Sequence, residues 1–384
     1  MELYDKPPSA LSLPNLRPAN QMPLEAEERT TYYDRPMIKI PKWRAYIPGY
    51  FWLGGIAGGA AMVGAVAGLT GGRGGRETAR HARYLSLALA IICPILLIAD
   101  LHRPERFFRM FRVFKVSSPL SVGTWVLSIF GLVSGALALR QAADDSFVIK
   151  RESQLGQLIR RLLPEGPLSV AQGLAGLGLG GYTGVLLAVT AVPLWAAGGI
   201  LLGPLFLATA LASGAAALTL IGLAFGERHP ESEHMRESVE VAETIGAVTQ
   251  LALVTARDAV VTPRINQPLR SGFWGVVYRA GAVGGGIAAP LGIRMAERFV
   301  SPRAARTLSA VAATLTIAGA LAERFAIVEA GKASAADPLA YQDLTAGALG
   351  EARPTPRQQA LNAPKSPAFR PQIAASDTLP GVAE

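Results

Sequence analysis

The chain has 384 residues, of which half are apolar, only 17% are charged and 41 are glycine, and its mean hydropathy is +0.31. An ordinary soluble domain carries about 25% charged residues, and glycine is frequent where membrane helices pack closely. This composition excludes a disordered chain and argues against a soluble enzyme, and the single cysteine, Cys93, excludes a disulfide scaffold. The net charge is +9, but the basic residues lie between apolar blocks as membrane flanks do, so no nucleic-acid partner is predicted.

Eight apolar stretches are close to the length that a helix needs to cross a bilayer core, about 20 residues. They are residues 50–69, 84–101, 119–139, 168–193, 199–225, 241–261, 272–291 and 308–328. The sixth also carries Glu243, Gln250 and Arg257, and we interpret it as a spanning helix whose polar stripe faces the interior of a bundle. The sequence therefore predicts an all-α integral membrane protein with a bundle of about eight transmembrane helices.

The two ends differ from this membrane domain, which we place at residues 46–330. Residues 1–45 form a polar extension without the pattern of a cleavable signal. Residues 331–384 are rich in Ala, Pro, Gln and Ser, and a disordered tail is expected there. Eight crossings place both termini on one membrane face, which we call side A, and the opposite face is side B. The glycine run at 71–75 is expected to form a short flexible loop on side B.

A polar cluster stands where the second apolar stretch ends on side A, with Asp100, His102, Arg103 and Arg106 in close succession. Translocon scales put Asp or Arg near a bilayer centre at about +2.5 to +3.5 kcal/mol each, so such residues pair internally or reach water. Asp100 with His102 is a candidate for proton transfer beside the polar head of a ligand. The alternative is a solvated helix end with snorkelling arginines.

Residues 105–115 predict a helix that lies in the membrane interface. On a helical wheel its four basic residues take one arc, and Phe107, Phe111 and Phe114 take the opposite one. The rings then face lipid, and the cations face lipid phosphate or a partner protein. A simple surface anchor and a docking site both remain open.

Tyr182 lies among glycines in the fourth apolar stretch, which leaves room for a flat ligand beside its ring. Its hydroxyl can equally form a hydrogen bond with a neighbouring helix. Arg279 and Arg324 fall inside later helices. Because buried cations without partners are rare, one of them is expected to pair with Asp100 or Glu323.

Ligands for a resident redox cofactor are scarce. A dihaem cytochrome b needs histidine ligands inside apolar helices, but three of the four histidines lie in predicted loops and only His102 is near a helix end. One cysteine cannot hold an iron–sulfur cluster, and no zinc-binding spacing occurs. We therefore predict no haem, no iron–sulfur cluster and no metal in this chain, so a redox role requires a diffusible cofactor.

Several segments resemble, in the same order, the NrfD family of membrane subunits of polysulfide-reductase-like complexes. The more specific segments are DLHRPERF at residues 100–107 and SPLSVGTW at residues 118–125. Weaker ones are IPGYF at 47–51, YTGVLL at 182–187 and the ER pair at 323–324. YYDRP at 32–36 resembles relatives that accompany formate-dehydrogenase-type enzymes.

The resemblance implies a quinone pocket at one membrane face, with menaquinone or ubiquinone as a diffusible ligand. It implies docking onto a ferredoxin-like iron–sulfur subunit, which connects the pocket to a molybdopterin catalytic subunit. It also implies a multi-pass protein of a bacterial or archaeal plasma membrane. Relatives place His or Asn near the start of the first helix, where this chain offers Tyr46, Tyr50 and Trp52.

We therefore expect a membrane-anchoring, quinone-interacting subunit of an oxidoreductase complex. The residues expected to bind the quinone are Tyr50, His102, Arg103 and Tyr182, and those expected to transfer protons are Asp100 and His102. The residues expected to pair charges or dock the partner are Arg106, Arg279, Glu323 and Arg324. Two other functions remain open: a passive anchor, and a proton or solute transporter that uses interior charges such as Glu243 as a route.

Overall fold

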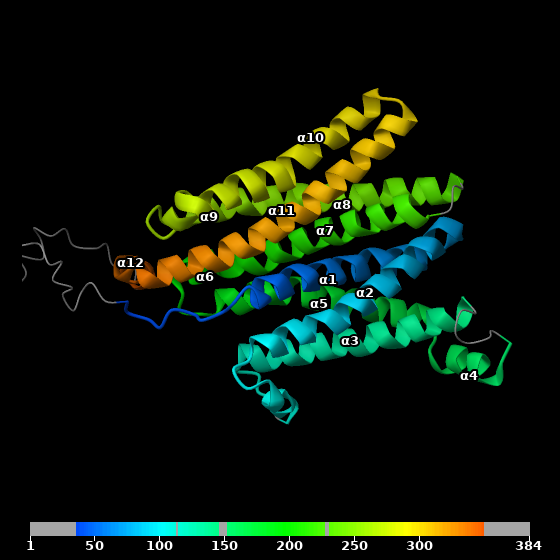
Figure 1. Cartoon of the computed structure of the whole chain (residues 1–384), viewed down its shortest axis with the longest axis horizontal. Helices are drawn as coiled ribbons and strands as arrows, with labels where there is room; N and C mark the ends of the chain where they lie inside the picture. Colours follow the sequence, from blue (N-terminus) through cyan, green and yellow to red (C-terminus); the bar gives the residue numbers. More distant parts are fainter. Residues whose placement is uncertain (1–35, 113, 146–151, 227–229, 349–384) are drawn as a thin grey trace, which may run out of the picture.

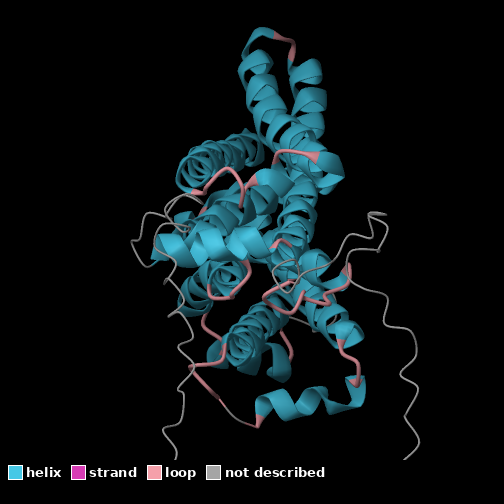
Figure 2. Cartoon of the chain, turned by 90° about the vertical axis from the view of Figure 1, so that its left-hand side faces the viewer, coloured by secondary structure: helices cyan, strands magenta, loops and turns pink. Residues whose placement is uncertain are grey.

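The structure is a computed structural model that describes residues 36–112, 114–145, 152–226 and 230–348. Every regular element within these ranges is a helix, as Figure 2 shows. Eight helical segments are long and apolar enough to cross a membrane. The predicted all-α membrane fold is therefore confirmed. Most of the predicted N-terminal extension, and the predicted tail from residue 349 onward, lie outside the described residues.

The spanning segments follow the predicted order, with shifts at their ends. The first four are α1 (Tyr46–Thr70), α2 (Gly72–Asp100), α3 (Pro119–Asp144) and α5 (Glu165–Ala188). The next four are α6 with α7 (Pro193–Gly198, Leu202–Phe225), α8 (Pro230–Val260), α9 with α10 (Gly272–Val276, Ala289–Ala296) and α11 (Pro302–Ala336). Shorter helices are η3 (Pro104–Phe111), α4 (Gln154–Leu162) and α12 (Pro338–Ala348). The loop expected at 71–75 is reduced to Gly71, because α2 already begins at Gly72.

The long helices lie side by side along the long axis of the molecule and alternate in direction (Figure 1). The start of α1 and the ends of α2, α5 and α11 gather at one end of the bundle, which is side A. α1 contacts α2, α5, α7 and α11, and α7 extends the core to α8. The described chain thus begins and ends on side A, as eight crossings require.

Close packing around α1 depends on glycines in both partners. Gly58 meets the backbone of Gly176 in α5, and Gly59 meets the backbone of Ala210 and Gly214 in α7. A Cβ at Gly59 would overlap the Ala210 carbonyl group. Small residues on two faces of α1 therefore let two neighbouring helices approach backbone to backbone, as they do in other membrane bundles.

Two spanning segments are interrupted. The fifth turns at Gly199, which has φ of 47°, and a single 3-10 turn, η4 (Gly199–Leu201), leads into α7. In the seventh, a π-helix, η6 (Val277–Ala288), separates α9 from α10. The fourth helix was expected to run to residue 193, and this is wrong, because α5 ends at Ala188 and Pro193 begins α6. Proline suits the first turn of a helix, where its missing amide hydrogen costs no internal bond.

The helical part also extends beyond residue 330. α11 continues to Ala336, and α12 packs against both α6 and α11. Ser334 is buried and accepts a hydrogen bond from the Leu194 amide at 3.1 Å. The disorder expected from residue 331 is therefore wrong for residues 331–348, because the small side chains of this segment pack onto α6.

Replacing Gly59 with alanine is expected to lower the melting temperature of the protein in detergent, because the added methyl group overlaps the α7 backbone. Gly135→Ala in α3 is the matched control, since a Cβ there would meet nothing within 4 Å. In an open helix interior, alanine stabilises by about 0.5–1 kcal/mol relative to glycine. Size-exclusion chromatography after heating measures the melting temperatures. Equal values for the two variants would contradict the packing role of Gly59.

Candidate functional site

Tyr50 is a buried phenol near the side A start of α1. It is 4% exposed, and its ring centroid lies 5.6 Å from that of Phe51. Its ring lies over Gly54, beside the Cys93 sulfur and Leu179. The Tyr50 hydroxyl makes no hydrogen bond with another described residue. The hydroxyl is not among the fully buried unpaired atoms of the described residues, so Tyr50 presents an unused donor that keeps some accessible surface.

Tyr182 is already engaged with a neighbouring helix. Its hydroxyl donates a hydrogen bond to the Pro119 carbonyl oxygen at the start of α3. Its ring lies against Gly123, where a Cβ would collide with it. Gly184, one of the flanking glycines, packs against the Leu202 carbonyl of α7. Of the two alternatives for Tyr182, the structure favours the helix–helix hydrogen bond over open space for a flat ligand.

Asp100 pairs with Arg44, a residue that the sequence did not single out. The Arg44 amide and Nε donate to Asp100 Oδ1 at 3.2 and 3.4 Å, and its Nη2 donates to the Ala99 carbonyl at 2.8 Å. The segment before α1 thus covers the end of α2, so the partner of Asp100 is neither Arg279 nor Arg324. The Asp100 side chain is 13% exposed and lies at the boundary between the bundle and side A water.

The other side A candidates lie on the surface. His102, Arg103 and Arg106 are exposed in the segment between α2 and α3, and Arg279 is exposed on η6. No described contact joins any of them to Tyr50. The structure therefore separates the exposed basic residues of this end from its buried phenol.

The interfacial helix expected at 105–115 is the shorter 3-10 helix η3, which has no buried residue. Its phenylalanine rings are exposed, and so are its arginines. Phe114, just after it, packs edge-on against Trp125 of α3, with ring centroids 6.0 Å apart. The segment thus presents rings and cations together to the outside, at the side A end of α2 and α3 (Figure 1).

The expected pairing of Arg324 with Glu323 is confirmed. Both side chains are 1% exposed, with Nη1 and Oε2 3.1 Å apart. Arg324 also donates to the Phe206 carbonyl at 3.0 Å and covers the ring of that residue, 3.5 Å from its centroid. Glu323 accepts hydrogen bonds from Thr209 at 2.7 Å and from Gln250 at 3.3 Å. This pair joins α7, α8 and α11 in the bundle interior.

The pair belongs to a polar stripe along the contact of α8 with α11. Its members are Arg236, Glu243, Gln250 and Arg257 on α8 and Ser309, Thr316 and Glu323 on α11. Each lies seven positions from the next, a spacing that keeps residues on one helix face. At side A, Arg257 donates to Asn266 at 2.6 Å and to the Tyr278 hydroxyl at 3.2 Å. Of the α11 members, only Glu323 was identified from the sequence, although the regular spacing of Ser309 and Thr316 was a visible signal.

Arg83 is a further buried cation that the sequence did not reveal. It lies in the side B half of α2 and donates to Glu165 at 2.7 Å, to Ser169 at 3.3 Å and to Gln141. In the sequence it stands next to the second apolar stretch, where a membrane flank is expected. Only the packing of α1 and α3 against α2, together with the side chains of Glu165 and Ser169 from α5, places it inside.

The side A end therefore offers a buried hydrogen-bond donor, a boundary carboxylate and an exposed cationic segment. Such a set can hold the polar head of an apolar ligand and exchange protons with water. In the part of the chain that the structure describes, no three His, Cys, Asp or Glu side chains gather as metal ligands.

Comparison with known proteins agrees with the resemblance seen in the sequence. A family model described as polysulphide reductase, NrfD, matches residues 37–336. The chain is also similar to a protein from Haemophilus influenzae named NrfD homolog, with 29% identity over 259 residues. That alignment covers 63% of this chain and 78% of the relative. The family match includes all eight spanning segments.

The carboxyl group of Asp145, just after α3, gives a pH test of the polar contacts around α2. Burial raises the pKa of Asp145, but hydrogen bonds from Gln141, Tyr84 and Arg80 outweigh this and hold it below the ordinary value of 3.8. A carboxyl with a lower pKa in the folded state stabilises that state above its unfolded pKa. The contribution is lost as the pH falls through the folded pKa.

Asp145→Asn is therefore expected to lower the melting temperature at neutral pH, with a difference from the wild type that shrinks as the pH falls below 3.8. Thermal unfolding of both proteins across this pH range measures it. A difference of constant size at all pH values would show that the charge of Asp145 is not involved.

Proposed function

The chain belongs to the NrfD family of membrane proteins, and from this we propose that it is the quinone-interacting membrane subunit of an oxidoreductase complex. In this role it exchanges electrons between a quinone dissolved in the bilayer and an iron–sulfur subunit bound at side A. Menaquinone or ubiquinone is then a substrate that enters from the membrane. The iron–sulfur subunit leads on to a molybdopterin subunit of polysulfide-reductase or formate-dehydrogenase type, in the plasma membrane of a bacterium or archaeon.

The unused hydroxyl of Tyr50 is the observation on which the proposal rests. This hydroxyl has no acceptor among the described residues and is not one of their fully buried polar atoms, so it is free to donate to a ligand. A quinone carbonyl oxygen is an acceptor that arrives attached to an apolar ring and tail. Phe51, Cys93 and Leu179 provide apolar surroundings near the Tyr50 ring. Tyr182 is assigned to the wall of the pocket, since its own hydroxyl is bound to Pro119.

Asp100 suits the proton part of the reaction. Oxidation of a quinol releases protons with the electrons, and reduction of a quinone takes them up. The Asp100 carboxylate is oriented by Arg44 and is partly exposed, so it contacts both the bundle and side A water. The exposed imidazole of His102, two residues further on, would carry protons between Asp100 and bulk water.

The segment around η3 suits docking of the partner. Arg103 and Arg106 are exposed beside exposed phenylalanine rings, and Arg and aromatic residues are enriched at protein interfaces. η3 follows Asp100 after only a short turn. A partner bound there would lie at the same end of the bundle as the proposed quinone site.

Tyr50→Phe in the purified complex is expected to lower quinol-linked turnover about tenfold, the effect of losing about 1.4 kcal/mol of stabilisation. Turnover of the catalytic subunit with an artificial electron donor is expected to stay unchanged. Tyr84→Phe, which removes a hydroxyl from the side B half of α2, is the matched control. Wild-type quinol-linked turnover in Tyr50→Phe would exclude Tyr50 from the quinone site.

Reversal of charge at the docking segment, Arg106→Glu with Arg109→Glu, is expected to reduce the amount of iron–sulfur subunit that co-purifies with this chain. Opposite charges across an interface favour association, and like charges oppose it. Arg161→Glu on α4, an exposed arginine at side B, is the control. Full retention of the partner by the double variant would place the docking surface elsewhere.

A further inference from the structure

Charged side chains gather near side B, where α8 meets α10 and α11, and we call them the side B cluster. Its members are Glu233, Arg236, Glu240, Glu243, Arg294, Glu297 and Arg306. At its centre the Arg294 guanidinium lies 2.5 Å from Glu243, 3.1 Å from Glu240 and 3.3 Å from Glu297. Thr316 donates to Glu243 at 2.8 Å. Glu243 is the innermost carboxyl, with 2% exposure.

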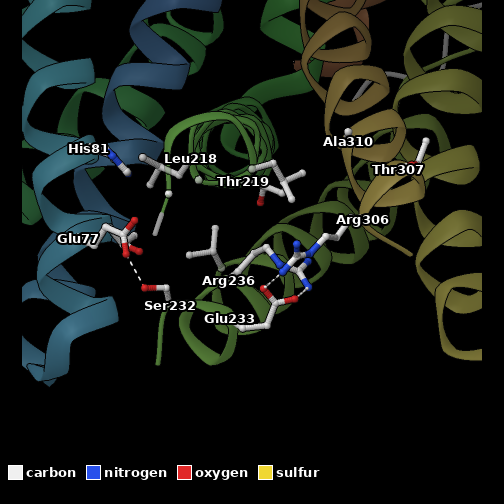
Figure 3. Close-up of a pocket in the computed structure, with 15 residues that line it drawn as sticks. Glu77, His81, Leu218, Thr219, Ser232, Glu233, Arg236, Arg306, Thr307 and Ala310 are labelled. Atoms are coloured by element: carbon white, nitrogen blue, oxygen red, sulfur yellow. Dashed lines mark hydrogen bonds and ion pairs between the residues drawn. The ribbon is translucent and has the colours of Figure 1, made fainter. Parts of the chain in front are cut away.

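The cluster extends outward without a break. Arg236 binds both Glu240 and Glu233, and Arg306 binds Glu233 at 3.0 Å, as Figure 3 shows for the outer residues. Ser309 of α11 donates a hydrogen bond to Glu240. Hydrogen bonds and ion pairs therefore connect the side B surface with the bundle interior.

The charges of the cluster do not balance. It contains four carboxyl groups and three guanidinium groups. Arginine stays protonated in proteins, so full ionisation leaves one excess negative charge. Such a charge is unfavourable inside a membrane bundle, and carboxylates that share a site resist ionising together. One proton bound among the four carboxyl groups restores neutrality.

A cavity of about 400 Å³ joins the cluster to side B. It lies between the side B parts of α2, α7, α8 and α11, and three members of the cluster form one wall (Figure 3). Glu77 and His81 of α2 line it from the other side, and α7 contributes no charged residue. The Thr219 hydroxyl of α7 faces the cavity, is 1% exposed, and has no hydrogen-bond partner among the described residues. A polar cavity of this size next to an unpaired hydroxyl indicates ordered water.

We propose that the side B cluster binds one exchangeable proton, which enters and leaves through this water-filled cavity. The proton passes from a hydronium ion in the cavity to a carboxylate oxygen of Glu233, the carboxyl group of the cluster that lines it, which leaves neutral water and a neutral carboxyl group. Release reverses the step, and no electron moves. The cluster lies at the opposite end of the bundle from Tyr50 and Asp100, so this role is separate from quinone binding and does not depend on it.

Infrared spectroscopy of the full-length chain in lipid nanodiscs tests the bound proton. At neutral pH the wild-type protein is expected to show the carbonyl band of a protonated carboxyl group, which shifts in D₂O. Because removal of any one of the four carboxyl groups restores balance, Glu243→Gln and Glu297→Gln are both expected to abolish this band. Absence of the band in the wild type, or its persistence in either folded variant, overturns the proposal.

Glu237→Gln is the matched control for these substitutions. Glu237 lies on α8 as well, but its side chain is 64% exposed beside His234 and outside the cluster. This variant is expected to keep the band. Loss of the band in Glu237→Gln would assign the signal to another carboxyl group and overturn the proposal.

The route through the cavity has its own test, since the single natural cysteine, Cys93, is buried. Thr307 lies at an exposed position of the cavity lining, so Thr307→Cys allows a bulky charged thiol reagent to be attached there. The label is expected to slow deuterium exchange of the carboxyl band about tenfold, the effect of a barrier raised by about 1.4 kcal/mol. The same label on Ser301→Cys, exposed before α11 and outside the lining, is expected to leave the rate unchanged. Equal exchange rates with and without the label at position 307 overturn the route.

Discussion

Water is excluded from the core of a bilayer, so a charged side chain inside this bundle has to find its partners within the protein. Much of the helix arrangement satisfies this requirement. Arg324 is held by Glu323 together with a backbone carbonyl of α7. Arg83 of α2 is held by Glu165 of α5 and by Gln141 of α3. Arg324 thus links α11 to α7, and Arg83 links α2 to α3 and α5, so each cation helps to fix how these helices are oriented.

Short-range pairing of this kind requires helices that approach closely, and the glycines provide the approach. Gly55 lies next to the Arg324 guanidinium, and Gly59 brings the α1 backbone against α7. Because apolar side chains gain little by leaving lipid for one another, small residues and internal hydrogen bonds account for much of the association of membrane helices. The high glycine content is therefore linked to the buried ion pairs, since both depend on short distances between backbones.

The two ends of the bundle differ in how their polar groups are satisfied. At side A, Tyr50 keeps an unused hydroxyl and η3 leaves its arginines exposed, which is an arrangement suited to a ligand and a partner. At side B, the inner carboxyl groups are bonded to Arg294, and the outer members of the cluster, Glu233, Arg236 and Arg306, line a cavity. Under the proposals above, the electrons and protons of the quinone reaction belong to the first end, and the separate exchangeable proton of the side B cluster belongs to the second.

The sequence alone determined the eight spans, their order, the common side of the termini and the family. These depend on hydropathy over about 20 consecutive residues and on short motifs, both of which are local properties of the chain. The pairing of Arg324 with Glu323 was also within reach, because the two residues are adjacent in sequence. The polar stripe of α8 was visible for the same reason, since it lies on one helix.

Only the tertiary structure decided which distant residues meet. Asp100 pairs with Arg44, and Glu243 pairs with Arg294, across separations that no local pattern records. The choice between a ligand contact and a helix contact for Tyr182 depended on where Pro119 lies. Residues 331–348 form ordered helices because they pack against α6. The physical reason is common to all of these: a charge or a hydroxyl is satisfied by the nearest suitable group in space, and packing of helix faces determines which group that is.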